Sequence, residues 1–221
     1  DALSQLLQEK INYHHEIGGA RGKGPKTKYQ ENVAAIKLLK DIEKENWRAT
    51  AAEQAILARY NGWGGLAQAF DAGNKNWQKE YVELKELLSE DEYRAARAST
   101  TSSFYTPPEV VSGIYQVLEQ CGFQKGYILE PSMGIGNFFA ALPESMQAKL
   151  FGVEVDSLSG RIAKQLYQKA DIQIKGFEQT HFDNASFDVV IGNVPFGSFK
   201  VYDKFSPEYS NYNIHDYFLL K

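Results

Sequence analysis

The sequence has almost no cysteine, since Cys121 is the single one among 221 residues. One thiol cannot form an internal disulfide, which excludes a disulfide-stabilised secreted scaffold and is typical of a reducing compartment. Long apolar runs are also missing, and no stretch approaches the roughly 20 residues that span a membrane. The polar N-terminus has no apolar core of a signal peptide. We therefore expect a cytoplasmic protein without a membrane segment.

An excess of positive charge is absent too, because 24 Lys and Arg face 28 Asp and Glu, for a net charge of −4. Nucleic-acid binding would therefore depend on a local patch and not on the overall field. The four histidines and Cys121 show no metal-ligand spacing, so no metal site is expected. With 43% apolar residues, the chain can bury one core and a smaller helical layer. The missing initial Met and the apolar end HDYFLLK predict a piece of a longer polypeptide.

Residues 1–103 carry helical signals and form the first expected domain. Apolar residues recur at three-residue spacing from Val33 to Ile42, and capping boxes at Thr50-Ala-Ala-Glu53 and Ser89-Glu-Asp-Glu92 predict two further helix starts. The basic segment GGARGKGPKTK, residues 18–28, predicts an irregular loop. A solvated linker and a loop that tracks phosphates would look the same here.

Residues 104–221 alternate between short strands and helices and form the second expected domain. Strands are expected at 127–130, 150–155, 172–176 and 187–192, with helices near 107–121, 137–141 and 157–170. This alternation predicts a parallel, doubly wound α/β sheet. Ligands of such sheets bind beyond the carboxyl ends of the strands. The residues at those ends are therefore the candidates for a site.

The first expected strand runs into LEPSMGIGNFF, where Gly134 and Gly136 let the backbone approach a ligand closely. The dinucleotide fingerprint is incomplete because Phe139 occupies its third glycine position, which argues against NAD or FAD. Glu154 ends the next expected strand, and a carboxylate there can accept both hydroxyls of a ribose. The pattern favours a nucleoside ligand without a diphosphate. The alternative is a glycine-rich turn with an unrelated surface glutamate.

Upstream, the segment FYTPPEV has the form of a helix start. The Thr106 hydroxyl would be the N-cap, Pro107 would take the first helical position, and Glu109 would be the third. A capping hydroxyl also lies beside free backbone N–H groups that can hold a ligand carboxylate. Capping and ligand binding are compatible, and the residues alone do not separate them.

The fourth expected strand ends in VVIGNVPFG, with an amide, a bare carbonyl and an aromatic ring. The Asn193 side-chain oxygen and the Val194 carbonyl can accept both hydrogens of an exocyclic amino group, while Pro195 fixes the backbone and Phe196 offers a stacking face. Two such acceptors restore lone-pair character to a conjugated amine and aim it at an electrophile. A base in a duplex would first be flipped out. An ordinary turn would explain Asn193 and Pro195, but not the aromatic ring after them.

The strings EPSMGIGNFF, FGVEVD, IGNVPFG and FYTPPEVV resemble the motifs of amino-methylating S-adenosylmethionine-dependent methyltransferases, in particular the N6-adenine DNA methyltransferases. The stretch ENVAAIKLLKDIEKENWRATAAEQAILARYNGWGGLAQAFD is similar to the one before the methylase domain in large methylase–helicase fusion proteins of conjugative elements and phages. The resemblance implies a Rossmann-like methyltransferase sheet with an N-terminal helical layer, S-adenosylmethionine as cofactor, DNA as substrate and a fused helicase region. It also implies a mobile-element or restriction-modification context.

The resemblance further implies roles for individual positions. The cofactor site would contain Tyr105, Thr106 and Pro107 at the methionine part, Glu130, Gly134 and Gly136 beneath it, Glu154 at the ribose, and Phe177 and Glu178 at the adenine. The target-amine site would contain Asn193, Val194 through its carbonyl, Pro195 and Phe196.

Two departures from the family pattern accompany the resemblance. The family usually has a second proline where Val194 stands, and its sheet continues beyond the strands present here, so we expect a domain that is incomplete at its C-terminal side. Whether the chain is active without those strands stays open. Other interpretations stay open as well: methylation of a glutamine amide or an RNA base, or a non-catalytic DNA-docking module of a mobile-element protein. Cofactor binding would separate the docking module from the enzymes.

Overall fold

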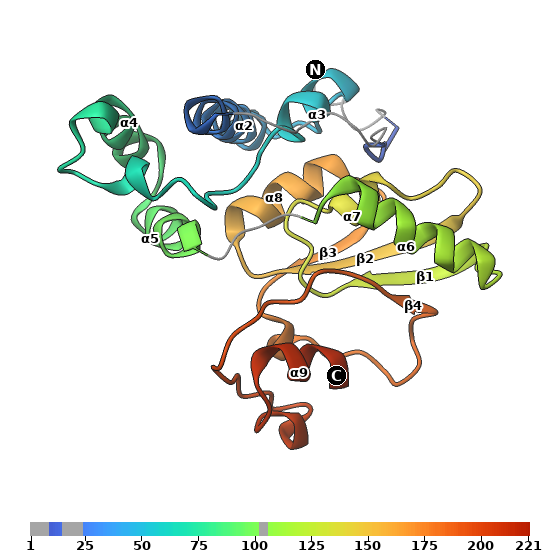
Figure 1. Cartoon of the computed structure of the whole chain (residues 1–221). Helices are drawn as coiled ribbons and strands as arrows, with labels where there is room; N and C mark the ends of the chain where they lie inside the picture. Colours follow the sequence, from blue (N-terminus) through green and yellow to red (C-terminus); the bar gives the residue numbers. More distant parts are fainter. Residues whose placement is uncertain (1–8, 15–23, 102–105) are drawn as a thin grey trace. The chain divides into compact units, whose positions relative to one another are not determined.

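The computed structural model of the chain describes residues 9–14, 24–101 and 106–221 (Figure 1). These residues fall into two compact units. Residues 9–13 and 24–101 belong to a helical unit, and His14 and residues 106–221 belong to a sheet unit. Within the described ranges, no helix combines the length and the apolar character that crossing a membrane requires.

The described part of the helical unit contains four α-helices, which turns and short 3-10 segments connect. The α-helices are α2 (Pro25–Glu45), α3 (Ala51–Leu57), α4 (Gln78–Leu87) and α5 (Glu90–Ala98), with 3-10 turns η1 (Ala67–Phe70), η2 (Lys75–Trp77) and η3 (Ser99–Thr101). Both predicted capping boxes are confirmed, at the starts of α3 and α5. The apolar stripe from Val33 to Ile42 is buried. Trp63, also buried, packs edge-on against the rings of Tyr60 and Phe70.

The prediction of an irregular loop over residues 18–28 is wrong for its last residues, because α2 already begins at Pro25. Proline at the first helical position has a favourable fixed φ and loses no hydrogen bond, so it starts this helix instead of breaking it. The Lys26 ammonium pairs with the Glu80 carboxylate at 2.5 Å and lies 3.9 Å from the centroid of the Trp77 ring. Residues 18–23 lie outside the described residues.

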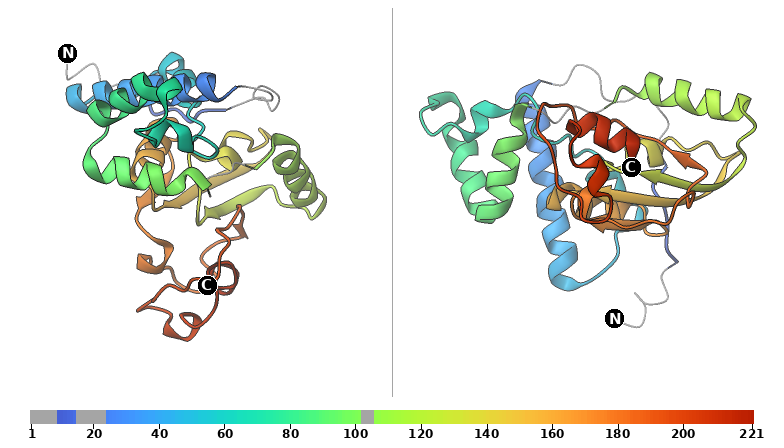
Figure 2. Two further views of the ribbon diagram at one scale, coloured as in Figure 1. Left: turned by 60° about the vertical axis from the view of Figure 1, so that its left-hand side comes forward. Right: turned by 90° about the horizontal axis from the view of Figure 1, so that it is seen from below.

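The sheet unit contains the parallel sheet that the sequence predicts. Its strands are β1 (Lys125–Glu130), β2 (Gln147–Glu154), β3 (Asp171–Ile174) and β4 (Val189–Val190), in the order β3-β2-β1-β4. All pairings are parallel. Three helices lie on one side of the sheet, namely α6 (Pro108–Gln120), α7 (Asn137–Ala140) and α8 (Ser157–Leu166), and α9 (Ile214–Leu220) lies on the other (Figures 1 and 2). The predicted doubly wound α/β class is confirmed.

The strand order creates a reversal point next to β1. From β1 the chain moves outward to β2 and β3, then returns to the opposite side of β1 to form β4. Crossover connections therefore leave on different sides of the sheet at β1, and the space beyond its carboxyl end is open to ligands. Glu130 and Glu154 are the last residues of β1 and β2, and the segment from Gly192 to Phe196 follows β4. The fold thus brings Glu130, Glu154 and the segment from Gly192 to Phe196 to the carboxyl ends of the strands.

The predicted start of α6 is wrong by one residue. Pro107, and not Thr106, is the N-cap, with φ −58° and ψ 139° and no side-chain cap bond, and the helix begins at Pro108. A residue that precedes proline is disfavoured in the helical conformation, so Pro108 keeps Pro107 extended and moves the helix start along the chain. Capping therefore does not account for Thr106, which is half-buried.

A C-terminal lobe, residues 198–221, packs beneath the sheet through an apolar cluster. Its Ile214 and Tyr217 join Leu129 and Val153 of the central strands and Phe177 in that cluster. The 3-10 turns η4 (Phe177–Gln179) and η5 (Pro207–Tyr209) complete the connection to α9.

The lobe is organised around the buried carboxylate of Asp203. This carboxylate accepts hydrogen bonds from the Tyr217 hydroxyl at 2.6 Å and from the Lys221 ammonium at 2.7 Å. The Lys221 side chain is 7% exposed and also donates to the carbonyls of Phe177 and Thr180. An ion pair with these additional partners fixes the position of α9.

Candidate functional site

Two buried carboxyl groups occupy the ends of the central strands. Glu130 is 2% exposed and Glu154 is 9% exposed. Glu154 accepts the backbone N–H of Gly134 at 2.6 Å and that of Asp156 at 2.7 Å, so it fixes the turn after β1 from the neighbouring strand. In the described part of the chain, the Glu130 Oε2 atom is buried and has no hydrogen-bond partner. A buried acceptor without a partner is costly and is a place for a ligand donor.

Burial changes the ionisation of both groups. Burial raises the pKa of Glu130 well above its usual range, and the negative charge of Glu154 raises this pKa further. Burial also raises the pKa of Glu154 to about 7, although the N–H groups of Asp156 and Gly134 act in the opposite direction. Paired acceptors in such a low-dielectric position suit a ligand that brings hydroxyl donors or positive charge.

The glycine-rich turn between these carboxyls leaves no space for a side chain at Gly136. Its φ is 85°, and a Cβ there would lie 2.5 Å from Cε2 of Tyr167. The Tyr167 hydroxyl donates to the Gly136 carbonyl at 2.6 Å, and the Met133 N–H donates to the Val153 carbonyl at 3.0 Å. The turn is therefore held from α8 and β2 with its backbone close to the strand ends.

The segment after β4 lies directly beside this turn. The Ser132 hydroxyl donates to the Asn193 carbonyl at 3.0 Å. A Cβ at Gly192 would lie 3.4 Å from Cγ of Glu130, which is ordinary packing distance and shows that the two strand ends touch. Beyond them the Asn193 side chain is exposed, and Phe196 is 76% exposed. The arrangement places an exposed amide and an exposed ring next to a pair of buried carboxyls.

The other predicted cofactor residues lie outside the group at the ends of β1 and β2. Thr106 and Pro107 precede α6, and Tyr105 lies outside the described residues. Phe177 is 5% exposed, and its ring packs in the lobe core with Phe218 at a centroid distance of 5.0 Å. The Glu178 carboxylate accepts the side-chain amide of Gln179 at 3.1 Å. Their proposed roles toward a cofactor stay predictions.

Sequence reasoning missed Ser132, whose hydroxyl joins the two halves of the site. The sequence contains no signal for this contact, because its partner is 61 residues away and becomes a neighbour only when β4 pairs with β1. The carboxyls and the glycines were found because each follows a recognisable strand.

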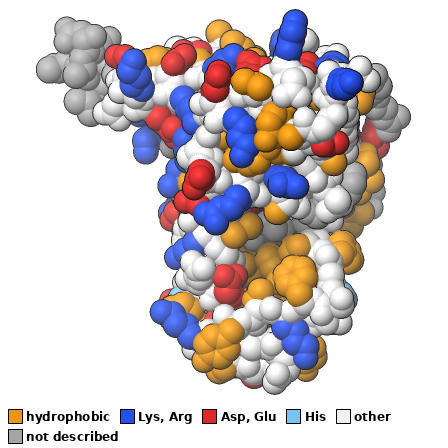
Figure 3. All heavy atoms as spheres, turned by 90° about the vertical axis from the view of Figure 1, so that its left-hand side faces the viewer, with side chains coloured by type: hydrophobic (Ala, Val, Ile, Leu, Met, Phe, Trp, Pro, Cys, Tyr) orange, Lys and Arg blue, Asp and Glu red, His pale blue; other side chains and the backbone are white. Residues whose placement is uncertain are grey.

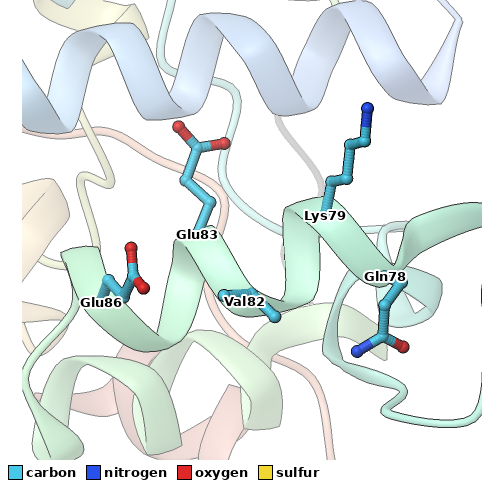
Figure 4. A pocket seen from close by; sticks show the side chains of 5 residues that line it. All are labelled: Gln78, Lys79, Val82, Glu83 and Glu86. Atoms are coloured by element: carbon cyan, nitrogen blue, oxygen red, sulfur yellow. The ribbon is translucent and has the colours of Figure 1, made fainter.

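A surface hollow elsewhere in the chain belongs to the helical unit and contains none of these residues. Side chains of α4 line it: Gln78, Lys79, Val82, Glu83 and Glu86 (Figure 4). Glu83 is already occupied by the Tyr29 hydroxyl and the Lys37 ammonium. We therefore assign the candidate site to the strand ends of the sheet unit.

The sheet unit has the features of a Rossmann-like α/β methyltransferase. The strand order of its parallel sheet reverses at β1, β1 and β2 end in acidic residues, and a glycine turn and an Asn-x-Pro-Phe segment follow strands of this sheet. The profile of the N-6 DNA Methylase family matches residues 86–216, and the chain belongs to this family.

Two named relatives share this region. Defense against restriction protein B of Escherichia phage P1 is 32% identical over 170 residues, which cover 76% of this chain and 6% of that protein. Type II methyltransferase M.NspV of Nostoc sp. is 32% identical over 104 residues, which cover 42% of this chain and 22% of that protein. The chain thus spans only a small part of either relative's length.

Among solved structures, the methyltransferase subunit of a type I restriction-modification system from Streptococcus thermophilus is similar over 83% of this chain and 60% of its own, with 11% identity and a TM-score of 0.39.

Proposed function

We propose that this chain transfers a methyl group from S-adenosylmethionine to the N6 amino group of adenine in DNA, as part of a longer cytoplasmic protein that also carries a helicase region. The observation that carries the proposal is the hydrogen bond between Ser132 and the Asn193 carbonyl. It joins the glycine turn after Glu130 to residues 193–196, which we call the amine segment. The family of the chain supports methyl transfer, and the Asn-x-Pro-Phe segment supports an amino group as the acceptor.

The residues present fit the cofactor. Among the described residues, the Glu130 Oε2 atom is buried without a hydrogen-bond partner. The Glu154 carboxylate, which accepts the N–H groups of Gly134 and Asp156, ends the neighbouring strand, and a carboxylate can accept further hydrogen bonds. We expect Glu154 to hold the ribose hydroxyls, and Glu130 with the Gly134 turn to lie under the methionine part, whose positive charge the carboxyls would stabilise. When bound, the cofactor would supply an electrophilic methyl group: its sulfonium S–CH3 bond would break as the N6–CH3 bond forms, S-adenosylhomocysteine would leave, and the amine would lose one proton.

The amine segment would act by orientation. The Asn193 side-chain oxygen and the Val194 carbonyl would accept both hydrogens of the adenine amino group and draw its lone pair out of conjugation. Phe196 would stack on the base after it has left the duplex. None of these groups needs to act as a strong base, because the amine becomes a nucleophile through its geometry.

The test combines cofactor binding and methyl transfer, measured on the complete protein. Titration calorimetry should detect S-adenosylmethionine binding that Glu154→Ala abolishes. Incubation with tritiated cofactor and unmethylated DNA from a methylase-deficient host should give N6-methyladenine, identified by mass spectrometry of the nucleosides. Asn193→Ala should keep cofactor binding and lose at least about 100-fold in kcat, the size expected when a preorganised polar group is removed.

Each alternative has its own outcome in this test. Cofactor binding with label entering RNA or protein, and none entering DNA, would replace adenine in DNA with another acceptor. DNA binding without any cofactor binding would favour the docking module and reject the enzyme.

A further inference from the structure

The ring of Phe196 is stacked on the ring of His215, which comes from the first turn of α9. The two ring centroids are 5.8 Å apart and the planes meet at 21°. Phe196 is nevertheless 76% exposed, so His215 covers one face and most of the remaining ring is open. Figure 3 shows hydrophobic and basic side chains close together on the surface of the C-terminal lobe. The open side of Phe196 is thus available to a second planar group.

His215 is held in place by the packing of α9. The residue before it, Ile214, is buried against Leu129 and Val153, the neighbours of Glu130 and Glu154 in their strands. The Ile214 N–H donates to the Phe199 carbonyl at 3.0 Å. Because the same strand ends carry the carboxyls and support α9, the imidazole has a fixed position relative to the site.

Packing, and not hydrogen bonding, defines the orientation of the imidazole. The Nδ1 atom of His215 is buried and has no hydrogen-bond partner within the described residues, and Nε2 lies 3.6 Å from an Asp216 oxygen. The flat face against Phe196 is the main directional contact of this side chain. The ring contact with Phe196, and not a hydrogen bond, therefore accounts for the orientation of the imidazole.

We propose that His215 is a positioning residue for the methylation reaction: it backs the Phe196 ring so that the target base stacks on the opposite face in a single orientation. The inference rests on the proposed function. An exposed phenylalanine without support would sample several rotamers, and each would present the base at a different angle. Since the amine must meet the methyl donor in line, a backed ring raises the fraction of bound bases in the reactive pose.

The experiment compares variants of the complete protein in methyl transfer to unmethylated DNA from a methylase-deficient host. His215→Leu keeps the volume but removes the flat face, whereas His215→Phe keeps the face and removes the nitrogens. We expect His215→Leu to lower kcat about three- to tenfold with a smaller change in the DNA KM, the range of one aromatic pair. His215→Phe should stay within about twofold of the parent.

Two further variants separate positioning from a general loss of packing. His181→Leu removes a comparable histidine–phenylalanine contact, that with Phe205 at 5.1 Å, and should leave kcat within about twofold. Adding His215→Leu to Phe196→Ala should cause no additional loss, because the imidazole acts only through that ring. Calorimetric titration with S-adenosylmethionine should give the same affinity for every variant and thereby show that each one is folded.

The outcomes distinguish a failure of the positioning role of His215 from a failure of the proposed function. If the parent methylates DNA and His215→Leu does so equally well, or if His215→Phe fails to restore the rate, the positioning role is overturned while the proposed function stands. If the parent transfers no methyl group to DNA, the proposed function fails and the role of His215 fails with it.

Discussion

At the scale of single residues, burial decides what Glu130 and Glu154 can do. Both sit where a parallel sheet presents its ligand site, and both lose the hydration that normally keeps a carboxyl ionised near neutral pH. Without a cofactor, each carboxyl therefore holds its proton to a higher pH than in an unfolded chain. The site is suited to a positively charged ligand because the ligand would replace the lost solvation.

We predict that the cofactor-free chain loses stability as the pH rises from about 5 to about 8. Below the ordinary pKa of 4.5 both carboxyls are protonated in the folded and the unfolded state. Above it the unfolded chain releases its protons first, so the folded state binds more protons and unfolding becomes easier until the folded pKa, about 7 for Glu154, is passed. Thermal unfolding across this pH range measures the effect.

Glu130→Gln is the variant that checks this explanation. It removes a buried ionisable group and keeps its shape, so its melting temperature should fall less between pH 5 and pH 8 and should exceed that of the parent at pH 8. Glu144→Gln, on an exposed carboxyl of the same unit, should reproduce the parent curve. A Glu130→Gln variant less stable than the parent at pH 8 would contradict the raised pKa of Glu130 as the cause of the pH dependence.

At the scale of secondary-structure elements, the sequence was most informative about the order of the strands, of which β1 and β2 have buried carboxyl ends. The four strands, the helix before them and the two helices between them were predicted in their order, because apolar β-branched runs and glycine turns are local signals. The limits were less accurate: β2 begins at Gln147, before the apolar run, since pairing with β1 and not burial sets its first residues. The start of α6 depended on a tandem proline and was misplaced.

The lobe around Asp203 shows why other parts of the site could not be predicted. Asp203 meets Lys221 across 18 residues and Tyr217 across 14, in a segment with little periodicity. His215 stacks on Phe196 across 19 residues of sequence, from the helix whose end this network holds. Such contacts depend on the tertiary arrangement, and no residue spacing in the sequence predicts them.

We predict that Asp203→Ala opens the lobe and leaves the sheet folded. The change leaves the Lys221 ammonium and the Tyr217 hydroxyl buried without their shared acceptor, which costs about 3–5 kcal/mol. Hydrogen exchange followed by mass spectrometry should show faster exchange in α9 and unchanged protection in β1 and β2. Glu208→Ala, on an exposed carboxyl of the same lobe, serves as the control and should leave α9 protected. Equal protection of α9 in Asp203→Ala would show that the network does not hold the lobe.

At the scale of the whole molecule, the chain contains two units that each bury their own core. We propose that they correspond to the two domains expected from the sequence, residues 1–103 and 104–221. The three tryptophans, Trp47, Trp63 and Trp77, all belong to the helical unit. Tryptophan emission therefore reports the unfolding of one unit alone.

We predict two unfolding transitions, of which S-adenosylmethionine shifts one. At a cofactor concentration 100 times its Kd, the sheet unit should gain about 2.7 kcal/mol because the ligand binds only its folded form. Calorimetry should show that transition moving to higher temperature, while the transition followed by tryptophan emission stays in place. A single transition that the cofactor shifts in both signals would instead mean that the two units unfold together.

The strand order also determines when each strand can pair while the chain is being synthesised. β1 meets β2 soon after it is made, whereas its other neighbour, β4, arrives 61 residues later, at the pairing of Ile128 with Val189. Closing a longer loop costs more entropy, and partners distant along the chain join late. We therefore expect a ribosome-bound chain to complete the turn between Glu130 and Glu154 well before Asn193 arrives beside it. The half of the site assigned to the methyl donor would mature first, and an unfinished chain would have no means of modifying DNA.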